Sequence, residues 1–270
     1  MSKTSLREKF IQLTGYWTYR KKLLPVGADI IVDLKEKIGI DINTIFDVGA
    51  NIGQTALHFT KYFPAATIHS FEPVSSTFQK LVSYTKDNPK IKCHQLALSD
   101  KKEQISISVF EDDQHSVLNS LNSQSQNTTQ GSKMETISTD TLDHFILENR
   151  IDSIDLLKID TEGYEIPVLD GAVNALQNNR IKLIYLEVGF SKKNLRNSYF
   201  VNVMDKLAQY DYALFGLYEI HHYDIENHNH FGNGLFPDFP RPSSWFAIQW
   251  SWRSTSWRCG LVSFHKTSWS

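Results

Sequence analysis

The 270-residue sequence contains little cysteine and no long apolar run. Its two cysteines, Cys93 and Cys259, are too few for a disulfide framework, which favours a reducing compartment. No stretch approaches the roughly 18 apolar residues that a membrane span needs. The first residues, MSKTSLREKFIQL, mix charges with apolar positions and therefore do not resemble a secretory signal. We expect a cytoplasmic protein with no membrane span.

An excess of charge of either sign is also missing. Lys and Arg total 28 and Asp and Glu total 30, which gives a net charge of -2. This balance gives no indication of nucleic-acid binding. The hydrophobic fraction of 41% is sufficient for a large core, and the length favours one elaborated domain.

Short apolar strands alternate with amphipathic helices along most of the chain. This alternation predicts an α/β fold with a doubly wound, mostly parallel sheet that is covered by helices on both faces. The predicted strands are 43–49, 66–73, 90–100, 104–110, 154–160, 181–188 and 212–220, and the predicted helices are 28–40, 54–64, 75–89, 139–149, 165–176 and 200–210.

The sequence suggests that the chain has three parts. Residues 1–40 are expected to form a helical lead-in, and residues 41–236 the main domain. Within that domain, residues 112–133 are rich in Ser, Asn, Gln and Thr and predict a polar insertion loop that could act as a lid. Residues 237–270 contain five of the six tryptophans and show no regular period. They are either a peripheral tail or sequence from a shifted reading frame, and we assign them no function.

The strand at 43–49 ends in an unusual way, with the acid Asp47 followed by Gly49, Asn51 and Gly53. Ligands of doubly wound sheets bind beyond the carboxyl ends of the strands, and glycines let backbone approach a ligand closely. The pattern G-x-G-x-x-G of dinucleotide sites is absent because Asn51 stands at its middle glycine. Asp47 would also repel a pyrophosphate, whereas it suits a cationic ligand.

A second acid, Glu72, ends the next strand. An acid at this place can accept hydrogen bonds from both hydroxyls of a ribose, and each bond to a charged group contributes about 1.5–3 kcal/mol. A ligand with a ribose, a positive centre and no phosphate is S-adenosylmethionine. Taken singly, Asp47 could be a helix cap and Glu72 a solvated strand end; together and in this order they favour the cofactor site.

Several segments resemble one known family. FDVGANIGQTA, HSFEP, LALSD, TDTLD and DLLKIDTEGYEIPVLDGA are similar, in this order, to FkbM-type methyltransferases, which are class I S-adenosylmethionine-dependent O-methyltransferases. The resemblance covers about residues 40–190, extends more loosely to 236, and is most specific at KIDTEGYE. It implies a seven-stranded sheet with an antiparallel last hairpin. It also implies contacts of the cofactor's methionine part, ribose and adenine with Asp47, Gly49, Ala50, Asn51, Gly53, Glu72, Pro73, Leu98 and Ser99.

Three residues are candidates for the reaction itself. Lys158 and Asp160 are two apart on one strand and face the same side, and the resemblance places Asp160 next to the cofactor's methyl group. We interpret Asp160 as the general base or as the group that orients an acceptor hydroxyl, and burial would have to strengthen so weak a base. The alternative is an internal ion pair of Lys158 with Asp160 or Glu162 that fixes the loop. Glu187, at the next strand end, is the third candidate.

Other polar groups receive a structural interpretation. Glu162 and Glu165 lie at a helix N-terminus, where acids suit the helix dipole. The segment HHYDIENHNH, 221–230, holds four of the ten histidines, but its spacing matches no ligand pattern that we can defend, so no metal is predicted.

The predicted function is therefore methyl transfer from S-adenosylmethionine to a hydroxyl group. By resemblance the acceptor is a sugar of a polysaccharide or glycolipid, or a secondary metabolite. Two alternatives stay open at this point: an NAD(P)-dependent reductase or epimerase on a related sheet, and a nucleotide-binding scaffold without activity.

Overall fold

The computed structural model describes residues 6–14, 23–110, 132–194, 196–224 and 229–238. The chain divides into two compact units, residues 1–238 and residues 239–270. The second unit contains the tryptophan-rich segment and lies outside the described residues, so the predictions for it remain untested. Most of the expected insertion loop, 111–131, lies outside them as well.

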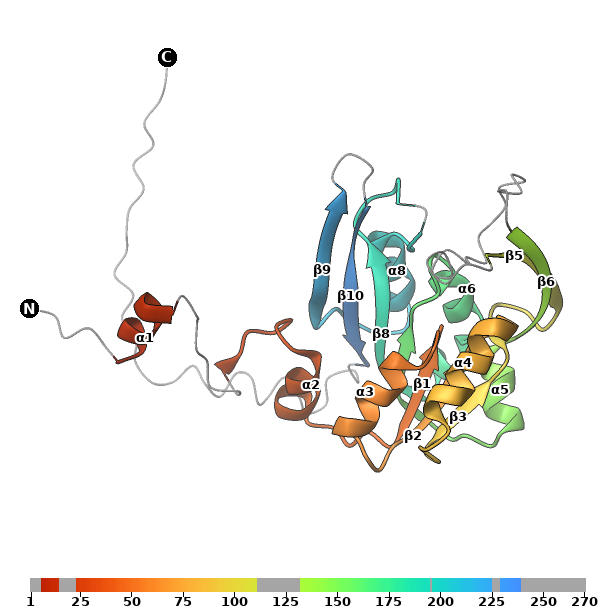
Figure 1. Cartoon of the computed structure of the whole chain (residues 1–270), viewed down its shortest axis with the longest axis horizontal. Coiled ribbons are helices and arrows are strands. Elements are labelled where there is room, and N and C mark those ends of the chain that lie inside the picture. The colour runs from red at the N-terminus through yellow and green to blue at the C-terminus, as the bar shows by residue number, and fades with distance from the viewer. Residues whose placement is uncertain (1–5, 15–22, 111–131, 195, 225–228, 239–270) are drawn as a thin grey trace, which may run out of the picture. The chain divides into compact units, whose positions relative to one another are not determined.

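A seven-stranded sheet forms the centre of the first unit (Figure 1). Its order is β3-β2-β1-β7-β8-β10-β9, and β10 runs antiparallel to both of its neighbours while the other pairs are parallel. This confirms the predicted mostly parallel sheet with an antiparallel last hairpin. The strands are β1 Thr44–Val48, β2 Thr67–Phe71, β3 Ile91–His94, β7 Ile154–Ile159, β8 Ile181–Gly189, β9 Gly216–Asp224 and β10 Asn229–Pro237.

A smaller sheet has the order β4-β6-β5. It comprises β4 Ala97–Leu98, β5 Gln104–Phe110 and β6 Ser132–Asp140. Two predictions need correction here. The expected single strand over 90–100 is two short strands in different sheets, and residues 132–133 of the expected loop begin β6, which the sequence analysis missed. The antiparallel partner β5, distant in sequence, is what makes this polar stretch a strand.

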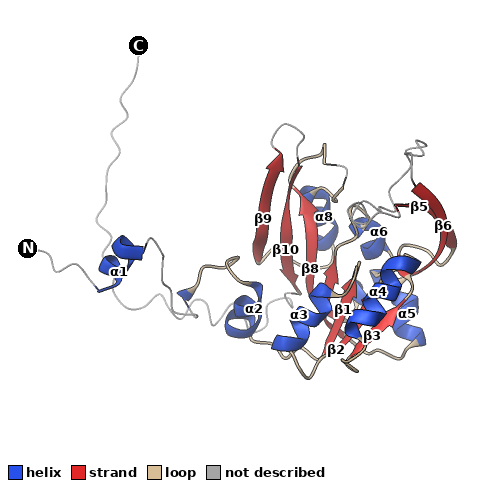
Figure 2. Cartoon of the chain, in the orientation of Figure 1, coloured by secondary structure: helices blue, strands red, loops and turns tan. Residues whose placement is uncertain are grey.

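Helices cover both faces of the central sheet, as predicted (Figure 2). The elements are α1 Leu6–Thr14, α2 Ile30–Val32 with the π-helix Asp33–Ile38, α3 Gln54–Tyr62, α4 Ser75–Thr85, α5 Leu142–Glu148, α6 Glu165–Asp170, α7 Val173–Gln177 and α8 Phe200–Ala208. The single helix expected over 165–176 is divided at Gly171. A Cβ at Gly171 would lie 1.9 Å from the carbonyl oxygen of Ser99, so only glycine permits this contact.

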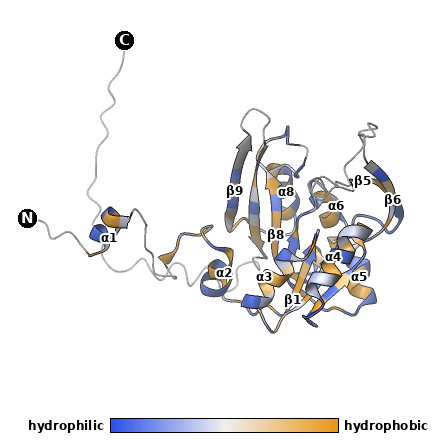
Figure 3. Cartoon of the chain, viewed as in Figure 1, coloured by the Kyte–Doolittle hydropathy of each residue, from blue (hydrophilic) through white to orange (hydrophobic). Residues whose placement is uncertain are grey.

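The core follows the alternation of side chains along the strands. Phe46 and Leu157 pack into one cluster with α5 to α8, whereas Ile45 and Leu156 pack into another with the π-helix and α3. In Figure 3 the helix α5 carries hydrophobic and hydrophilic colours on different sides, in keeping with a helix that covers a sheet. Among the described helices, none is both long and apolar enough to cross a membrane.

Candidate active site

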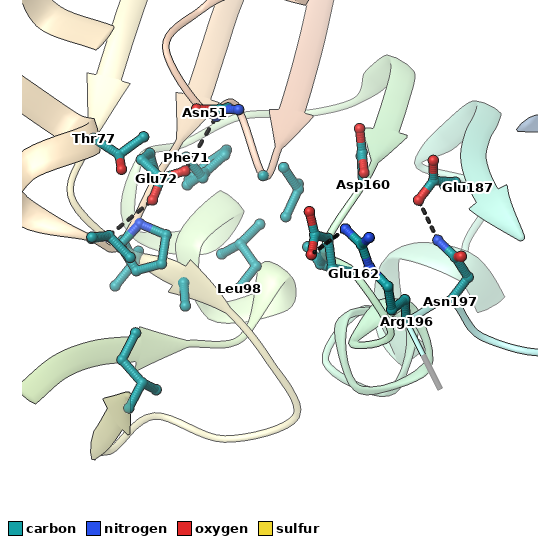
Figure 4. A pocket seen from close by; sticks show the side chains of 18 of the residues that line it. Asn51, Phe71, Glu72, Thr77, Leu98, Asp160, Glu162, Glu187, Arg196 and Asn197 are labelled. Carbon is teal, nitrogen blue, oxygen red and sulfur yellow. Dashed lines mark hydrogen bonds and ion pairs between the residues drawn. The ribbon is translucent and has the colours of Figure 1, made fainter. Parts of the chain in front are cut away.

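A cavity of about 480 Å³ opens beyond the carboxyl ends of β1, β2, β7 and β8. Figure 4 shows its labelled side chains in two groups, which we name by their strands. The β1–β2 half contains Gly49, Asn51, Phe71, Glu72, Pro73, Thr77 and Leu98, and the β7–β8 half contains Asp160, Thr161, Glu162, Glu187, Asn194, Arg196 and Asn197.

In the β1–β2 half, the carboxylate of Glu72 is held by backbone. Its Oε2 accepts the N–H of Asn51 at 3.2 Å, and its Oε1 accepts the N–H of Val74 at 3.0 Å. Burial raises the pKa of Glu72 to about 7, while these two donors oppose the rise. The result is an almost buried acid with a fixed orientation on the cavity wall.

The glycine bend after β1 is shaped by the protein itself. Gly49 has φ 76°, and a Cβ there would lie 1.8 Å from the carbonyl oxygen of Asp160. Gly53 has φ 94°, and its Cβ would lie 2.9 Å from side-chain carbons of Leu81 and Thr85 on α4. From the sequence we predicted that these glycines allow the backbone to approach a ligand. In the structure, the atoms that lie close to both glycines belong to the protein itself.

Lys158 links β1 to the end of β7. The strand register places Asp47 opposite Lys158, and the Lys158 Nζ lies 3.2 Å from Asp47 Oδ1 and 3.3 Å from Asp160 Oδ2. Burial would lower the pKa of Lys158, but the two carboxylates outweigh it and raise that pKa. Burial raises the pKa of Asp47, and Lys158 opposes the rise. Lys158 therefore joins a fully buried acid to one that is exposed to the cavity.

The β7–β8 half is rich in carboxylates. Glu187 Oε2 accepts a hydrogen bond from the side-chain amide of Asn197, and Glu162 Oε2 lies 3.3 Å from a guanidinium nitrogen of Arg196. Burial, reinforced by Asp160 and other nearby acids, raises the pKa of Glu187 to about 8. Burial also raises the pKa of Glu162 to about 7, against the influence of Arg196.

Five of the nine residues predicted to contact the cofactor line the cavity. They are Gly49, Asn51, Glu72, Pro73 and Leu98. Asp47, Ala50, Gly53 and Ser99 are buried and are not among the lining residues. Of the three catalytic candidates, Asp160 and Glu187 line the cavity, whereas Lys158 is buried behind Asp160. The internal Lys158–Asp160 pair considered as an alternative is present; Asp160 is 41% exposed and not buried as the base hypothesis required.

Sequence reasoning missed the part of the wall that follows β8. Asn194, Arg196 and Asn197 line the cavity from the segment between β8 and α8, and Phe231 lines it from β10. The sequence does contain a signal for this wall, because the polar connection after the strand that carries Glu187 belongs at the ligand-binding edge of a parallel sheet.

Two groups of residues contain side chains of types that bind metal ions. Asp140, His144 and Glu148 have ligand atoms within 4.8 Å of one another. The ammonium group of Lys102 lies 3.3 Å from Asp140 Oδ2 and already supplies a cation there. In the histidine-rich segment, 221–224 end β9 and 229–230 begin β10, while 225–228 lie outside the described residues.

The sheet order, the antiparallel last hairpin and the cavity at the carboxyl ends of the parallel strands define the class I methyltransferase fold. The sequence profile of the methyltransferase FkbM domain matches residues 47–214, more than half of the chain. The chain therefore belongs to the FkbM methyltransferase family.

Several known proteins are similar to this chain. The hexuronic acid methyltransferase AglP of Haloferax volcanii is 30% identical over 172 residues, which span 62% of this chain and 65% of that relative. The crystal structure of methyltransferase FkbM from Methylobacillus flagellatus KT has a TM-score of 0.48 and 15% identity, covering 74% of this chain and 46% of that one. Fibrillarin from Aeropyrum pernix, solved with S-adenosyl-L-methionine, has a TM-score of 0.42 and 12% identity, covering 75% and 71%.

Proposed function

We propose that this protein transfers a methyl group from S-adenosylmethionine to a hydroxyl group of a sugar. The observation that carries the proposal is one cavity with two different halves. The β1–β2 half presents a carboxylate, Glu72, fixed by backbone N–H groups. The β7–β8 half presents three carboxylates, of which Asp160 and Glu187 are the candidates for the reaction.

The β1–β2 half fits the cofactor chemically. The Glu72 carboxylate is oriented by its two backbone donors and can accept hydrogen bonds from ribose hydroxyls. Phe71 and Leu98 supply an apolar wall suited to a purine ring. The carboxylates of the neighbouring half favour a positively charged sulfonium. When bound, S-adenosylmethionine supplies the electrophilic methyl group and leaves as S-adenosylhomocysteine.

The β7–β8 half supplies groups for the acceptor. In the reaction the bond from sulfur to the methyl carbon breaks, the bond from acceptor oxygen to that carbon forms, and the hydroxyl proton passes to a carboxylate. Asp160 is held by Lys158 and orients the hydroxyl, while Glu187 accepts the proton. The pKa of Glu187, raised by burial to about 8, makes its ionised form a stronger base than an ordinary carboxylate.

The acceptor class rests on the relative and on the lining groups. The Haloferax relative is named for a hexuronic acid, which is a sugar. The amides of Asn194 and Asn197, the guanidinium of Arg196 and the ring of Phe231 line the cavity, and side chains of these kinds bind hydroxyl groups and sugar faces.

The cofactor is tested by thermal unfolding with S-adenosylmethionine, S-adenosylhomocysteine and NAD. Stabilisation by the first two supports the proposal, and stabilisation by NAD alone would replace it with the reductase alternative. Transfer of a radioactive methyl group to p-nitrophenyl glucoside or glucuronide tests the acceptor. Cofactor binding without transfer to any glycan would favour the scaffold alternative.

The roles of the carboxylates are tested by substitution. Asp160→Asn and Glu187→Gln should each lower kcat by about 100-fold or more, while S-adenosylhomocysteine still binds. The exposed Asp152→Asn, at the other end of β7, is the matched control and should leave kcat unchanged. Full activity of either active-site variant would remove that residue from the mechanism.

A further inference from the structure

Glu165, the first residue of α6, is a buried acid with an unusual set of partners. Its Oε1 accepts the N–H of Thr161 at 3.1 Å, the hydroxyl of Thr161 at 3.1 Å and the N–H of Gly163 at 3.0 Å. Its Oε2 accepts the N–H of Ser198 at 3.0 Å. One carboxylate therefore joins the loop after β7 to the segment before α8, which lie more than thirty residues apart.

Both of these segments form the wall of the β7–β8 half. Asp160, Thr161 and Glu162 come from the first, and Arg196 and Asn197 come from the second. Glu165 is not a lining residue itself. Its hydrogen bonds thus act on the residues that would meet an acceptor.

The loop after β7 needs such support. Glu162 has φ 50° and Gly163 has φ 99°, so two consecutive residues adopt left-handed backbone, which is unfavourable for a glutamate. The donors on either side of Glu162, Thr161 N–H and Gly163 N–H, both point to the same oxygen of Glu165. This arrangement fixes the turn that directs Glu162 toward Arg196.

The segment before α8 is held from two sides at Ser198. Its N–H donates to Glu165, and its carbonyl oxygen accepts the N–H of Gly189 at the end of β8 at 2.9 Å. Asn197, the preceding residue, then reaches Glu187 with its side-chain amide, and Asn194 donates to Asn197 Oδ1 at 2.8 Å. The position of the Glu187 carboxylate thus depends on a chain of contacts that begins at Ser198.

We propose that Glu165 is a positioning residue of the β7–β8 half: it sets the distance and orientation between the loop carrying Asp160 and the segment carrying Asn197. This inference rests on the proposed function. It adds a determinant of acceptor alignment that touches neither acceptor nor cofactor. Helix-dipole stabilisation, which the sequence suggested for this acid, would need no hydrogen bond to Ser198.

The test is Glu165→Gln in the full chain, because glutamine has the same shape but replaces one acceptor oxygen by an NH₂ donor. The glutamine oxygen should occupy the position that accepts three hydrogen bonds, so the NH₂ group faces the N–H of Ser198 and the segment before α8 loses its partner. The matched control is Asp155→Asn. Asp155 is also buried and accepts two backbone N–H groups, from Asn43 and Thr44, but it lies at the opposite end of β7.

Four quantities are measured for both variants: the unfolding midpoint, the Kd for S-adenosylhomocysteine, kcat and KM with a glycoside acceptor, and amide hydrogen exchange at Ser198. Both variants should lower the unfolding midpoint. At a temperature where both are folded, E165Q should lower kcat/KM for the acceptor by about 100-fold, the effect expected of a misplacement of about 1 Å, with Kd unchanged. D155N should keep wild-type kcat/KM. Exchange at Ser198 should accelerate in E165Q alone.

Three results would overturn the inference: wild-type kcat/KM in E165Q, an equal loss in D155N, or unchanged exchange at Ser198. Glu165→Asp should behave like E165Q, because its side chain is one methylene shorter and cannot reach both segments; full activity of this variant also counts against the proposal. A wild-type protein that transfers no methyl group to any glycoside refutes the proposed function instead. The exchange measurement then still decides whether Glu165 holds Ser198.

Discussion

Replacing Lys158 with methionine should destabilise the fold strongly, because it leaves Asp47 buried without a counter-charge. The Lys158 ammonium lies 3.2 Å from Asp47 and 3.3 Å from Asp160. At an effective dielectric constant of about 20, each contact corresponds to about 5 kcal/mol of attraction before the cost of burial. Asp160 is 41% exposed and would regain water, so it adds little. Breaking one buried pair costs about 3–5 kcal/mol.

The second variant in this test is the double substitution D47N/K158M. It removes both buried charges, so the unpaired acid that destabilises K158M is no longer present. We expect the double variant to recover most of the lost free energy of unfolding, because two neutral groups of similar volume replace the pair.

Urea unfolding followed by far-UV circular dichroism measures both variants. If K158M lowers the free energy of unfolding by less than about 1 kcal/mol, the reasoning is refuted. An Asp47 that is buried without its counter-charge must destabilise the fold by more than that. A double variant no more stable than K158M would refute it equally, because the cost would then come from packing and not from charge.

Three further predictions follow from the same contacts. Gly49→Ala should lower stability and cofactor affinity much more than the control Gly39→Ala. Both glycines have a left-handed φ, but only a Cβ at Gly49 would clash with backbone, at 1.8 Å from the carbonyl oxygen of Asp160. Equal urea midpoints of the two variants would contradict this. Glu72→Gln should weaken S-adenosylhomocysteine binding about 10-fold or more in calorimetry, from the loss of charged hydrogen bonds of about 1.5–3 kcal/mol; unchanged affinity would move the ribose elsewhere. Burial lowers the pKa of His69 and His94 to about 4, so the unfolded chain binds protons that the folded rings exclude between pH 6.5 and 4. Across that range the free energy of unfolding of the wild-type chain should fall more than that of H69F/H94F in urea titrations. The difference should be up to about 3 kcal/mol from the buried His69, with a smaller part from the partly exposed His94, and parallel pH profiles would contradict it.

The sequence predicted the lining of the β1–β2 half of the cavity more completely than that of the β7–β8 half. Glu72 stands at a strand end, and the carboxyl ends of neighbouring parallel strands meet at one edge, so a local pattern is enough to place it. Asp47 has the same kind of position in the sequence, but the strand register pairs it with Lys158 and buries it. An acid at a strand end can face the cavity or pair with a lysine of the neighbouring strand. The local sequence pattern does not reveal which strand is the neighbour, so it cannot decide between the two.

By itself the sequence determined the parallel strands of the central sheet, the helices that cover them and the order of the strand-end acids, because hydrophobic periodicity and glycine bends are local properties. Only the tertiary structure decided that Gly49 makes room for the backbone carbonyl of Asp160 just after β7, that β5 and β6 pair, and that Glu165 joins two distant segments. These features arise when residues far apart in the chain come within hydrogen-bonding or van der Waals distance, and that proximity is a property of the packed fold.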